Sequence, residues 1–282
     1  MDGSLRADLV LHGGATGGIA LAGAVAALEE RGYRFPRIAG ASAGAVVGAL
    51  VAAGAPGKRV KEMLLDLDFA RFRERPLVEG LGPIGTATMV ALRKGWRRGG
   101  YLRAWLSDAL RELGVETFAD LALDDPGADP SMRRPDRAYR FVAMASDAVC
   151  LPWACRERLG LDPSRFGVAE AVRASTTVPF YLRPAGSADA ADVFDRTDGA
   201  EPRWPTFGVQ IAARPGRGRG RTIFVDTRPA RATEFDVSDR CAEALYEVGR
   251  AATTAFLDGD GDNPSWDVAE YRRRGATPSR RP

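Results

Sequence analysis

The pentapeptide Gly40-Ala41-Ser42-Ala43-Gly44 constrains the fold of this chain more than any other segment. It has the form G-x-S-x-G and stands between a short apolar segment and an apolar run that ends at Ala53. Glycines two residues before and after the serine allow a sharp reversal from strand to helix with little side-chain clash. Such a turn places the Ser42 hydroxyl at the N-terminus of the helix, where free N–H groups favour a negative oxygen. The segment therefore predicts a nucleophile; a small-residue turn in an alanine-rich protein is the alternative.

A second glycine-rich turn precedes this one in the chain. Ala7–Leu11 has the apolar character of a buried strand, His12–Gly18 is rich in glycine, and Ile19–Arg31 has a helical pattern. Strand, glycine loop and helix form an arrangement that binds phosphates or oxyanions, because exposed backbone N–H groups can approach an anion closely. A dinucleotide-binding fold is the rival. It fits poorly, because Ala15 replaces the second glycine of G-x-G-x-x-G and the second strand ends without an acid.

The rest of the chain alternates between helical and strand patterns. Further helices are expected near Lys58–Leu67, Tyr101–Leu113, Val168–Ala174 and Asp239–Leu257, and further strands at Tyr139–Ser146, Thr206–Ala213 and Arg221–Asp226. The Gly/Arg-rich stretch Pro215–Gly220 suggests a hairpin between the last two strands, and Arg71–Gly100 suggests a surface excursion or lid. No repeat or linker is evident. We therefore expect one α/β domain over residues 5–257 and a loosely structured tail over residues 258–282.

Composition narrows the function class. A net charge of +3 over 282 residues is too small to indicate a nucleic-acid partner, and 45% hydrophobic residues are typical of a soluble globular protein. Cys150, Cys155 and Cys241 are odd in number and lack metal-ligand spacing, which favours a reducing compartment and no metal cofactor. Met1–Leu11 lacks the features of a signal peptide, and the apolar run Ala43–Ala53 is too short to span a bilayer. A cytoplasmic location is expected.

A serine nucleophile needs a base, and the chain offers two routes. His12 is the sole histidine, so a Ser-His-Asp triad would have to use it; a loop role is the alternative. The other route is direct deprotonation by a carboxylate in a partly desolvated site. Asp198 is the candidate, because the adjacent Gly199 lets its carboxylate enter a tight site. Asp-Gly is also a common turn dipeptide, so a surface turn is the alternative.

Together, these segments resemble the patatin-like phospholipase family. The resemblance covers Ala7 to Leu257 and rests, in chain order, on the glycine loop before a helix, G-x-S-x-G at residues 40–44, Ala174-Ser175-Thr176-Thr177-Val178-Pro179 and Asp198-Gly199-Ala200. It implies a three-layer α/β/α fold, a mainly parallel sheet, and hydrolysis of acyl esters of lipids by a Ser-Asp dyad without metal or other cofactor. By this resemblance Ser42 is the nucleophile and Asp198 the base. The oxyanion loop then contains Gly13, Gly14 and Gly18.

The chain departs from the family pattern at three places. The family's loop is typically Gly-Gly-Gly-x-Arg/Lys-Gly, whereas this chain has Ala15 at the third glycine and Gly17 at the basic position. A methyl group at Ala15 would turn or obstruct an oxyanion donor, and losing one such donor costs about 3 kcal/mol of transition-state stabilisation. The third departure is Ala185–Asp192, which stands where the family usually carries the catalytic Asp motif. Another acid such as Asp189 or Asp192, or no acid, is therefore the alternative to Asp198.

These departures motivate a second hypothesis, a catalytically impaired pseudoenzyme that acts as a lipid-binding or interaction module. In both hypotheses the expected partner is a lipid or another acyl ester. Basic clusters such as Arg97-Arg98 and Arg272–Arg274 suggest weak peripheral membrane contact, worth about 1 kcal/mol per charge near an anionic surface; solvated loops are the alternative. The sequence sets no acyl chain length, head group or oligomeric state.

Overall fold

A six-stranded, mainly parallel sheet forms the centre of the protein. The computed structural model describes residues 5–13, 17–67, 100–123, 138–146, 149–177, 194, 205–212, 220–230, 239–259 and 265–267. The sheet has the order β6-β5-β4-β2-β7-β8. Its strands in chain order are β2 (Asp8–Gly13), β4 (Ile38–Ser42), β5 (Phe141–Ser146), β6 (Val149–Leu151), β7 (Thr206–Ile211) and β8 (Thr222–Val225). All neighbouring strands are parallel except β5 and β6, so the predicted α/β class with a mainly parallel sheet is confirmed.

The last two strands correct one expectation. A hairpin at Pro215–Gly220 requires antiparallel strands, but β7 and β8 pair in parallel, with Gly208 opposite Thr222 and Ile211 opposite Val225. The hairpin prediction is therefore wrong. Glycine and arginine in the connection indicated a turn, and turn composition carries no information about the direction of the next strand. Three short strands were not predicted. One is β6 at the edge of the sheet, and the other two, β1 (Leu5–Arg6) and β3 (Tyr33–Arg34), form a separate parallel pair.

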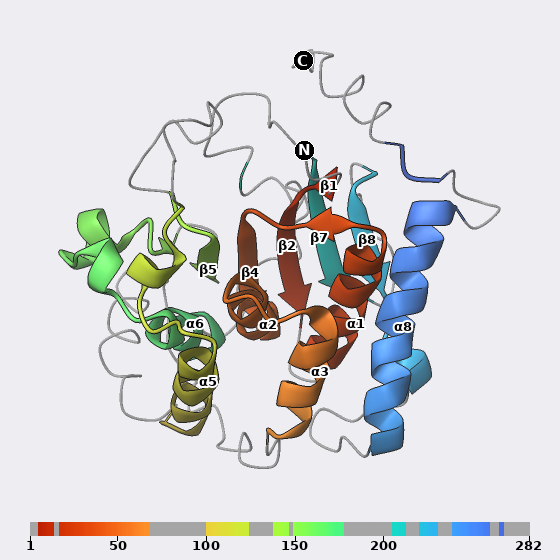
Figure 1. Ribbon diagram of the computed structural model, residues 1–282, viewed down its shortest axis with the longest axis horizontal. Coiled ribbons are helices and arrows are strands. Elements are labelled where there is room, and N and C mark those ends of the chain that lie inside the picture. Colours follow the sequence, from red (N-terminus) through yellow and green to blue (C-terminus); the bar gives the residue numbers. More distant parts are fainter. Residues whose placement is uncertain are drawn as a thin grey trace, which may run out of the picture.

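Six helices described by the structure pack over one face of the sheet (Figure 1). They are α1 (Gly17–Glu30), α2 (Ala43–Ala52), α3 (Gly57–Leu65), α5 (Gly100–Glu112), α6 (Val168–Thr177) and α8 (Asp239–Asp258). Single-turn helices lie at Phe118–Leu121, Cys155–Leu159, Pro163–Arg165 and Arg228–Ala230. The predicted helices are confirmed, with α6 running on through Thr177. No helix among those described has the length and apolar character needed to cross a bilayer.

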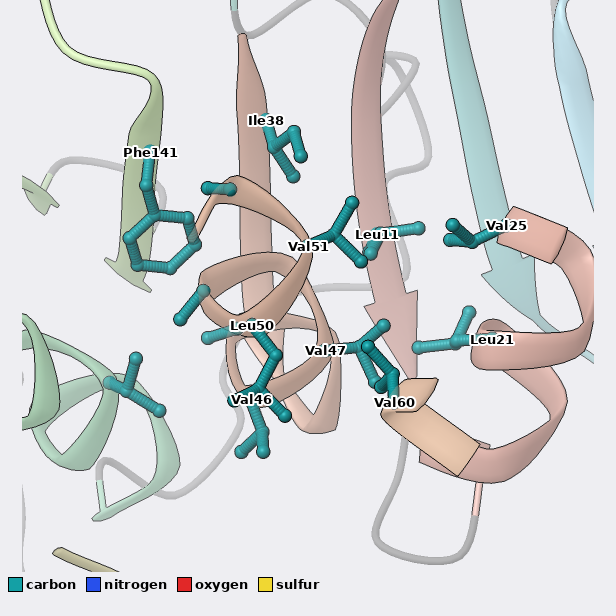
Figure 2. Packing of buried hydrophobic residues seen from close by; sticks show 14 of the residues in the cluster. Leu11, Leu21, Val25, Ile38, Val46, Val47, Leu50, Val51, Val60 and Phe141 are labelled. Atoms are coloured by element: carbon teal, nitrogen blue, oxygen red, sulfur yellow. The ribbon is translucent and has the colours of Figure 1, made fainter. Parts of the chain in front are cut away.

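The main core lies between the sheet and these helices. Leu11, Ile38 and Phe141 point from three strands toward α1 and α2, where they meet side chains such as Leu21 and Val47 (Figure 2). The apolar residues of α2 are buried all round, because α2 packs on the sheet while α1, α5 and α6 flank it. The core therefore holds α2 against β2, β4 and β5, with its first residue directly after the carboxyl end of β4.

Helices α1 and α8 cross with their backbones in direct contact. A Cβ atom built on Gly23 would lie 2.1 Å from the carbonyl oxygen of Tyr246, and one built on Gly249 would lie 1.9 Å from that of Ala20. Both distances are far shorter than any real Cβ contact, so this approach needs glycine on each helix. Figure 1 shows α8 lying alongside α1 at the edge of the helical layer.

The opposite face of the sheet carries a second, smaller core. Side chains alternate along each strand, so Val10, Ala39 and Val142 point away from the helices just described and pack with Phe194. Phe194 is in helical conformation and 1% exposed. Its ring lies 4.6 Å from the guanidinium carbon of Arg37. The second face of the sheet thus also carries buried apolar side chains, as expected for an α/β/α arrangement.

A buried ion pair joins the two central strands at their amino ends. Asp8 begins β2, and Arg37 directly precedes β4. The Arg37 guanidinium donates to both carboxylate oxygens of Asp8, over 3.1 Å from Nε and 2.5 Å from Nη2. The two residues are 0% and 4% exposed. The pair therefore links β2 to β4 at the end of the sheet opposite Ser42.

Several expectations concern segments outside the described residues. The lid at Arg71–Gly100, except for Gly100 itself, lies there, as does most of residues 258–282. Within that C-terminal stretch, the ring of Trp266 packs against Phe207 and Phe256, with centroids 5.0 and 5.6 Å apart. The domain limits at residues 5–257 and 258–282 stay predictions.

Candidate active site

Ser42 lies at the junction of β4 and α2, at the carboxyl edge of the sheet. Its φ of 56° and ψ of −123° belong to a region that residues with a side chain rarely adopt. Among the described residues other than glycine, Ser42 alone has a positive φ. The predicted strand-to-helix turn is confirmed. The side chain of Ser42 is half-buried, and its backbone has the strained conformation that characterises nucleophile turns of α/β hydrolases.

The two glycines of G-x-S-x-G make this turn sterically feasible. A Cβ atom on Gly40 would lie 2.2 Å from the carbonyl oxygen of Gly44, and one on Gly44 would lie 2.2 Å from that of Leu11. Helix α2 thus starts in contact with the end of its own strand and with β2. Side chains at either position would push α2 away from the sheet and move Ser42.

The glycine loop borders Ser42 from the neighbouring strand. Gly13 ends β2 and is paired with Ser42 in the parallel register. Helix α1 begins at Gly17, and a Cβ atom on Gly18 would lie 3.8 Å from Cβ of Ala43, the first residue of α2. The structure therefore brings Gly13 and Gly18 to Ser42. The first N–H groups of a helix have no partner within the helix, so two sets of such donors begin beside the serine.

The position where the family pattern has a basic residue is closed by a side chain from β7. A Cβ atom on Gly17 would lie 2.8 Å from Cγ1 of Ile211, and one on Gly13 would lie 2.7 Å from the same atom. Ile211 thus occupies the space that a side chain at position 17 needs. This contact gives a steric reason for glycine at a position where the resemblance led us to expect arginine or lysine.

The structure adds a residue to which the sequence assigned no role. Ser175, near the end of α6, is 3% exposed. Its Oγ accepts a hydrogen bond from the backbone N–H of Ser42 over 3.0 Å and donates one to the carbonyl oxygen of Met144 over 2.7 Å. Ser175 belongs to the Ala174–Pro179 motif, which was a signal of the family, but its partners lie far away in the sequence.

Of the two candidate bases, the structure describes His12 but not Asp198. His12 lies in β2, in register with Ala41 and Gln210, and its place two residues after Val10 puts its side chain on the second face of the sheet. Asp198 and its alternatives Asp189 and Asp192 lie outside the described residues, as do Gly14 and Ala15. The identity of the base and the role of Gly14 therefore stay predictions.

Other candidate chemistry is sparse in the part of the chain that the structure describes. No group of three His, Cys, Asp or Glu side chains there is arranged to hold a metal ion, and the absence of a metal from the reaction stays a prediction. Burial raises the pKa of the Cys155 thiol to about 11, so this sulfur is protonated at neutral pH and is a poor nucleophile. Arg221, which borders the expected basic hairpin, is 2% exposed and so presents no charge to a surface.

The sequence matches a family model over most of this region. Residues 9–200 match the model described as patatin-like phospholipase. A curated relative, the uncharacterized protein YqhO of Bacillus subtilis (strain 168), is 27% identical over 296 residues, covering 89% of this chain and 97% of the relative. The match to the family model includes Ser42, Ser175 and Asp198.

Solved structures show the same fold. The chain is similar to a structure of full-length SpcU in complex with full-length ExoU from the type III secretion system of Pseudomonas aeruginosa, with a TM-score of 0.52 and 19% identity over 91% of this chain and 53% of the other. It is also similar to the type III effector protein ExoU, with a TM-score of 0.50 and 20% identity over 89% of this chain and 52% of that one. The chain spans about half the length of these structural relatives. This likeness and the layered sheet confirm the predicted α/β/α fold.

Proposed function

We propose that this chain, which belongs to the patatin-like phospholipase family, is a serine hydrolase that cleaves acyl esters of lipids through a dyad of Ser42 and Asp198. The observation that carries the proposal is the backbone of Ser42, with φ 56° and ψ −123° at a strand-to-helix turn. Such strain is maintained where a function requires it, and here it holds a hydroxyl at the start of a helix.

The first chemical step is acyl transfer to Ser42. Asp198 takes the hydroxyl proton as Oγ attacks the ester carbonyl, and a tetrahedral intermediate forms. The intermediate then collapses with cleavage of the ester C–O bond, and the proton from Asp198 goes to the departing alcohol. An acyl-enzyme remains. Asp198 next takes a proton from water, whose oxygen attacks the acyl carbon to form a second tetrahedral intermediate. This intermediate collapses with cleavage of the bond between the acyl carbon and Oγ, the proton on Asp198 goes to Oγ of Ser42, and a carboxylic acid is released.

The negative oxygen of each intermediate needs hydrogen-bond donors. The first turns of α1 and α2 begin beside Ser42, and their leading N–H groups have no partner within their helices. Preorganised donors of this kind typically supply about 3 kcal/mol each to the transition state. The proximity of Gly18 to Ala43 supports a shared oxyanion site formed by the glycine loop and the start of α2.

The second candidate function is a pseudoenzyme of the same fold that binds lipid or a protein partner. Two observations favour it: Ala15 replaces a loop glycine, and Ile211 fills the space at Gly17. Both would weaken the oxyanion loop. Neither removes the serine or its strained turn, so we place hydrolysis first.

The first prediction tests the dyad. A fluorophosphonate probe should label the wild-type protein, and Ser42→Ala should abolish both the labelling and the hydrolysis of a short p-nitrophenyl ester. Asp198→Asn preserves the shape of the side chain but removes the proton acceptor, so turnover should fall about 10³-fold or more. The measurements are the initial rate of p-nitrophenol release and the labelled fraction by mass spectrometry.

Asp189→Asn and Asp192→Asn are the matched controls and should leave the rate within a few-fold. If Asp198→Asn is silent and a control variant is inactive, the base is misassigned but the hydrolase stands. If wild-type protein neither reacts with the probe nor hydrolyses the ester, the pseudoenzyme is the better description.

A further inference from the structure

The hydrogen-bond ladder between β4 and β5 is interrupted at the nucleophile. The strands pair in parallel from Ile38 opposite Phe141 to Gly40 opposite Ala143. At the start of this ladder the N–H of Ile38 donates to the carbonyl oxygen of Arg140 over 2.8 Å. In a parallel pair this series repeats every two residues, so it would reach the N–H of Ser42 and the carbonyl oxygen of Met144.

The hydroxyl of Ser175 stands between these two groups. It accepts from the N–H of Ser42 over 3.0 Å and donates to the carbonyl oxygen of Met144 over 2.7 Å. A hydroxyl is suited to this place because it is donor and acceptor at once. The side chain therefore replaces one rung of the ladder and lets β4 separate from β5 where the chain turns into α2.

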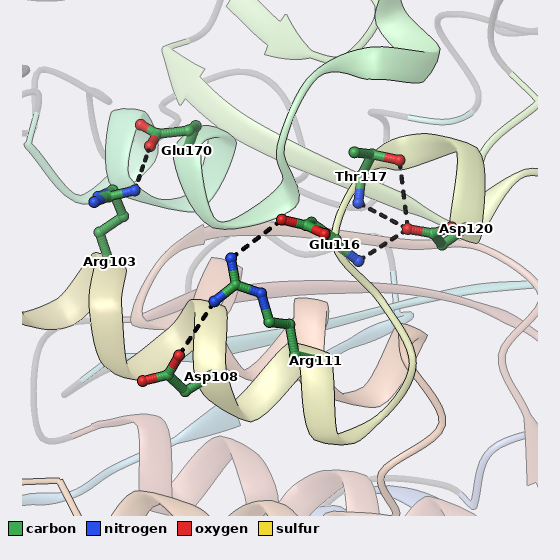
Figure 3. Close-up of polar contacts among 7 residues, drawn as sticks. All are labelled: Arg103, Asp108, Arg111, Glu116, Thr117, Asp120 and Glu170. Atoms are coloured by element: carbon green, nitrogen blue, oxygen red, sulfur yellow. Dashed lines mark hydrogen bonds and ion pairs between the residues drawn. The ribbon is translucent and has the colours of Figure 1, made fainter.

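Helix α6, which carries Ser175, is anchored on its other side. Figure 3 shows Arg103 of α5 reaching Glu170 of α6, over 3.2 Å. The N–H of Val168, the first residue of α6, donates to the carbonyl oxygen of Glu116 over 3.1 Å. In the same loop the carboxylate of Asp120 accepts from the N–H groups of Thr117 and Glu116, and these bonds hold its pKa below the usual range. These contacts hold α6, and with it the Ser175 hydroxyl, in place.

We infer that Ser175 is a positioning residue for the nucleophile: its hydroxyl holds the Ser42 amide in the strained turn and thereby aims Oγ of Ser42. This inference rests on the proposed function. Without the hydroxyl, the Ser42 N–H and the Met144 carbonyl would both lose their partner, and β4 would be free to close the gap by direct pairing. Direct pairing would draw the Ser42 backbone toward β5. Because displacements of about 1 Å can slow a reaction 10²-fold, the turnover number should suffer rather than substrate affinity.

The second prediction compares four proteins: wild type, Ser175→Ala, Ser175→Thr and Thr176→Ala. Thr176 is the matched control, because its hydroxyl donates to the carbonyl oxygen of Arg173 within the same helix. Ser175→Ala should slow fluorophosphonate labelling of Ser42 and lower kcat for a p-nitrophenyl ester by about 10- to 100-fold, with little change in KM. Ser175→Thr retains the hydroxyl and should recover most of the rate, and Thr176→Ala should match wild type.

A folding readout separates positioning from structural damage. Hydrogen exchange of the Ser42 amide, followed by NMR, should be faster in Ser175→Ala than in Thr176→Ala at equal distance below each Tm. If Ser175→Ala does not fold, Ser175→Cys, which has a weaker donor and acceptor, carries the same expectations. Equal labelling rates in wild type and Ser175→Ala would overturn the inference. A wild-type protein that is never labelled would instead contradict the proposed function, and the exchange rate of the Ser42 amide would then decide whether the bridge exists.

Discussion

At the scale of single residues, Ser42 carries strain that a glycine at the same position would not. Its φ of 56° and ψ of −123° place Cβ close to neighbouring backbone atoms, whereas glycine adopts positive φ without that conflict. Positions of this kind typically store about 1–3 kcal/mol. The conformation alone would favour glycine, yet the chain has serine there. A serine at such a position is expected if its hydroxyl has a function.

The third prediction follows from this strain. Ser42→Gly should be more stable than Ser42→Ala by about 1 kcal/mol, since alanine retains Cβ at positive φ and glycine does not. Ser107, in the interior of α5, is the matched control. There the order should reverse, with Ser107→Ala more stable than Ser107→Gly by about 1 kcal/mol because of helix propensity. The measurement is the free energy of unfolding in urea, and the same order at both positions would contradict the strain.

At the scale of elements, the crossing of α1 and α8 depends on two glycines. Each helix presents a backbone carbonyl to the glycine of the other, and the Cβ positions would lie 1.9 and 2.1 Å from those oxygens. Helix α1 also supplies the first turn beside Ser42. A change in the distance between α1 and α8 is therefore expected to shift the oxyanion loop as well as the packing of the core.

The fourth prediction concerns Gly249→Ala. Helix propensity favours alanine in a helix interior, but here the methyl group meets the carbonyl oxygen of Ala20, so the helices must separate. We expect a loss of about 1–3 kcal/mol in the free energy of unfolding. Gly100→Ala is the control, because a Cβ atom at Gly100 meets nothing within 4 Å at the start of α5, and it should be neutral or stabilising. A Gly249→Ala protein as stable as wild type would show that the crossing is looser than described.

Local patterns predicted the elements that local forces determine. The spaced apolar residues of α5 and α8 indicated helices because their periodicity records which face is buried, whereas the unbroken apolar run after Ser42 indicated a helix buried all round. The direction of β8 was mispredicted because strand pairing is set by contacts with β7 rather than by composition. The two-residue strands β1 and β3 escaped because so short a segment has no periodicity.

At the scale of the whole molecule, the two ends of the sheet differ. A charged pair is buried at the amino end of the central strands, and the strained backbone of Ser42 lies at the carboxyl end. The Asp8–Arg37 pair closes the amino end of the central strands, and Phe194 covers the guanidinium from the second face. Burying an ion pair rarely adds much stability over an apolar pair, but breaking one leaves a charge uncompensated. The pair links β2 to β4 in the same register that places Gly13 opposite Ser42.

The fifth prediction compares this pair with an exposed one. Asp8→Asn keeps the shape of the side chain but leaves the buried guanidinium of Arg37 facing a neutral amide, so the free energy of unfolding should fall by about 3–5 kcal/mol. Asp258→Asn removes the partner of Arg31 at the surface, where water solvates both groups, and should change stability far less. Thermal and urea unfolding measure both effects. A similar loss in the two variants would contradict the importance of burial.

The turn at Ser42 was predictable from consecutive residues, and the approach of Gly13 and Gly18 to it followed from the family resemblance. Ser42 and its two glycines form one short motif, so their turn could be predicted. Ser175 and Ser42 are separated by 133 residues, and Asp8 and Arg37 by 29; their hydrogen bonds depend on the packing of α6 and on the register of the sheet. The sequence contains both residues of each such pair, but its patterns do not show which residues bond to each other.

The closeness of Ile211 to Gly13 and Gly17 couples the residues that positions 17 and 211 can carry. A basic side chain at position 17 requires the side chain of Ile211 to shift, since Cβ alone would lie 2.8 Å from Cγ1. A smaller residue at position 211 would leave room for a side chain at position 17, but beside two glycines it would also reduce packing. We therefore expect the effects of substitutions at positions 17 and 211 to depend on one another. A close relative with a basic residue at position 17 should therefore carry a smaller residue at position 211.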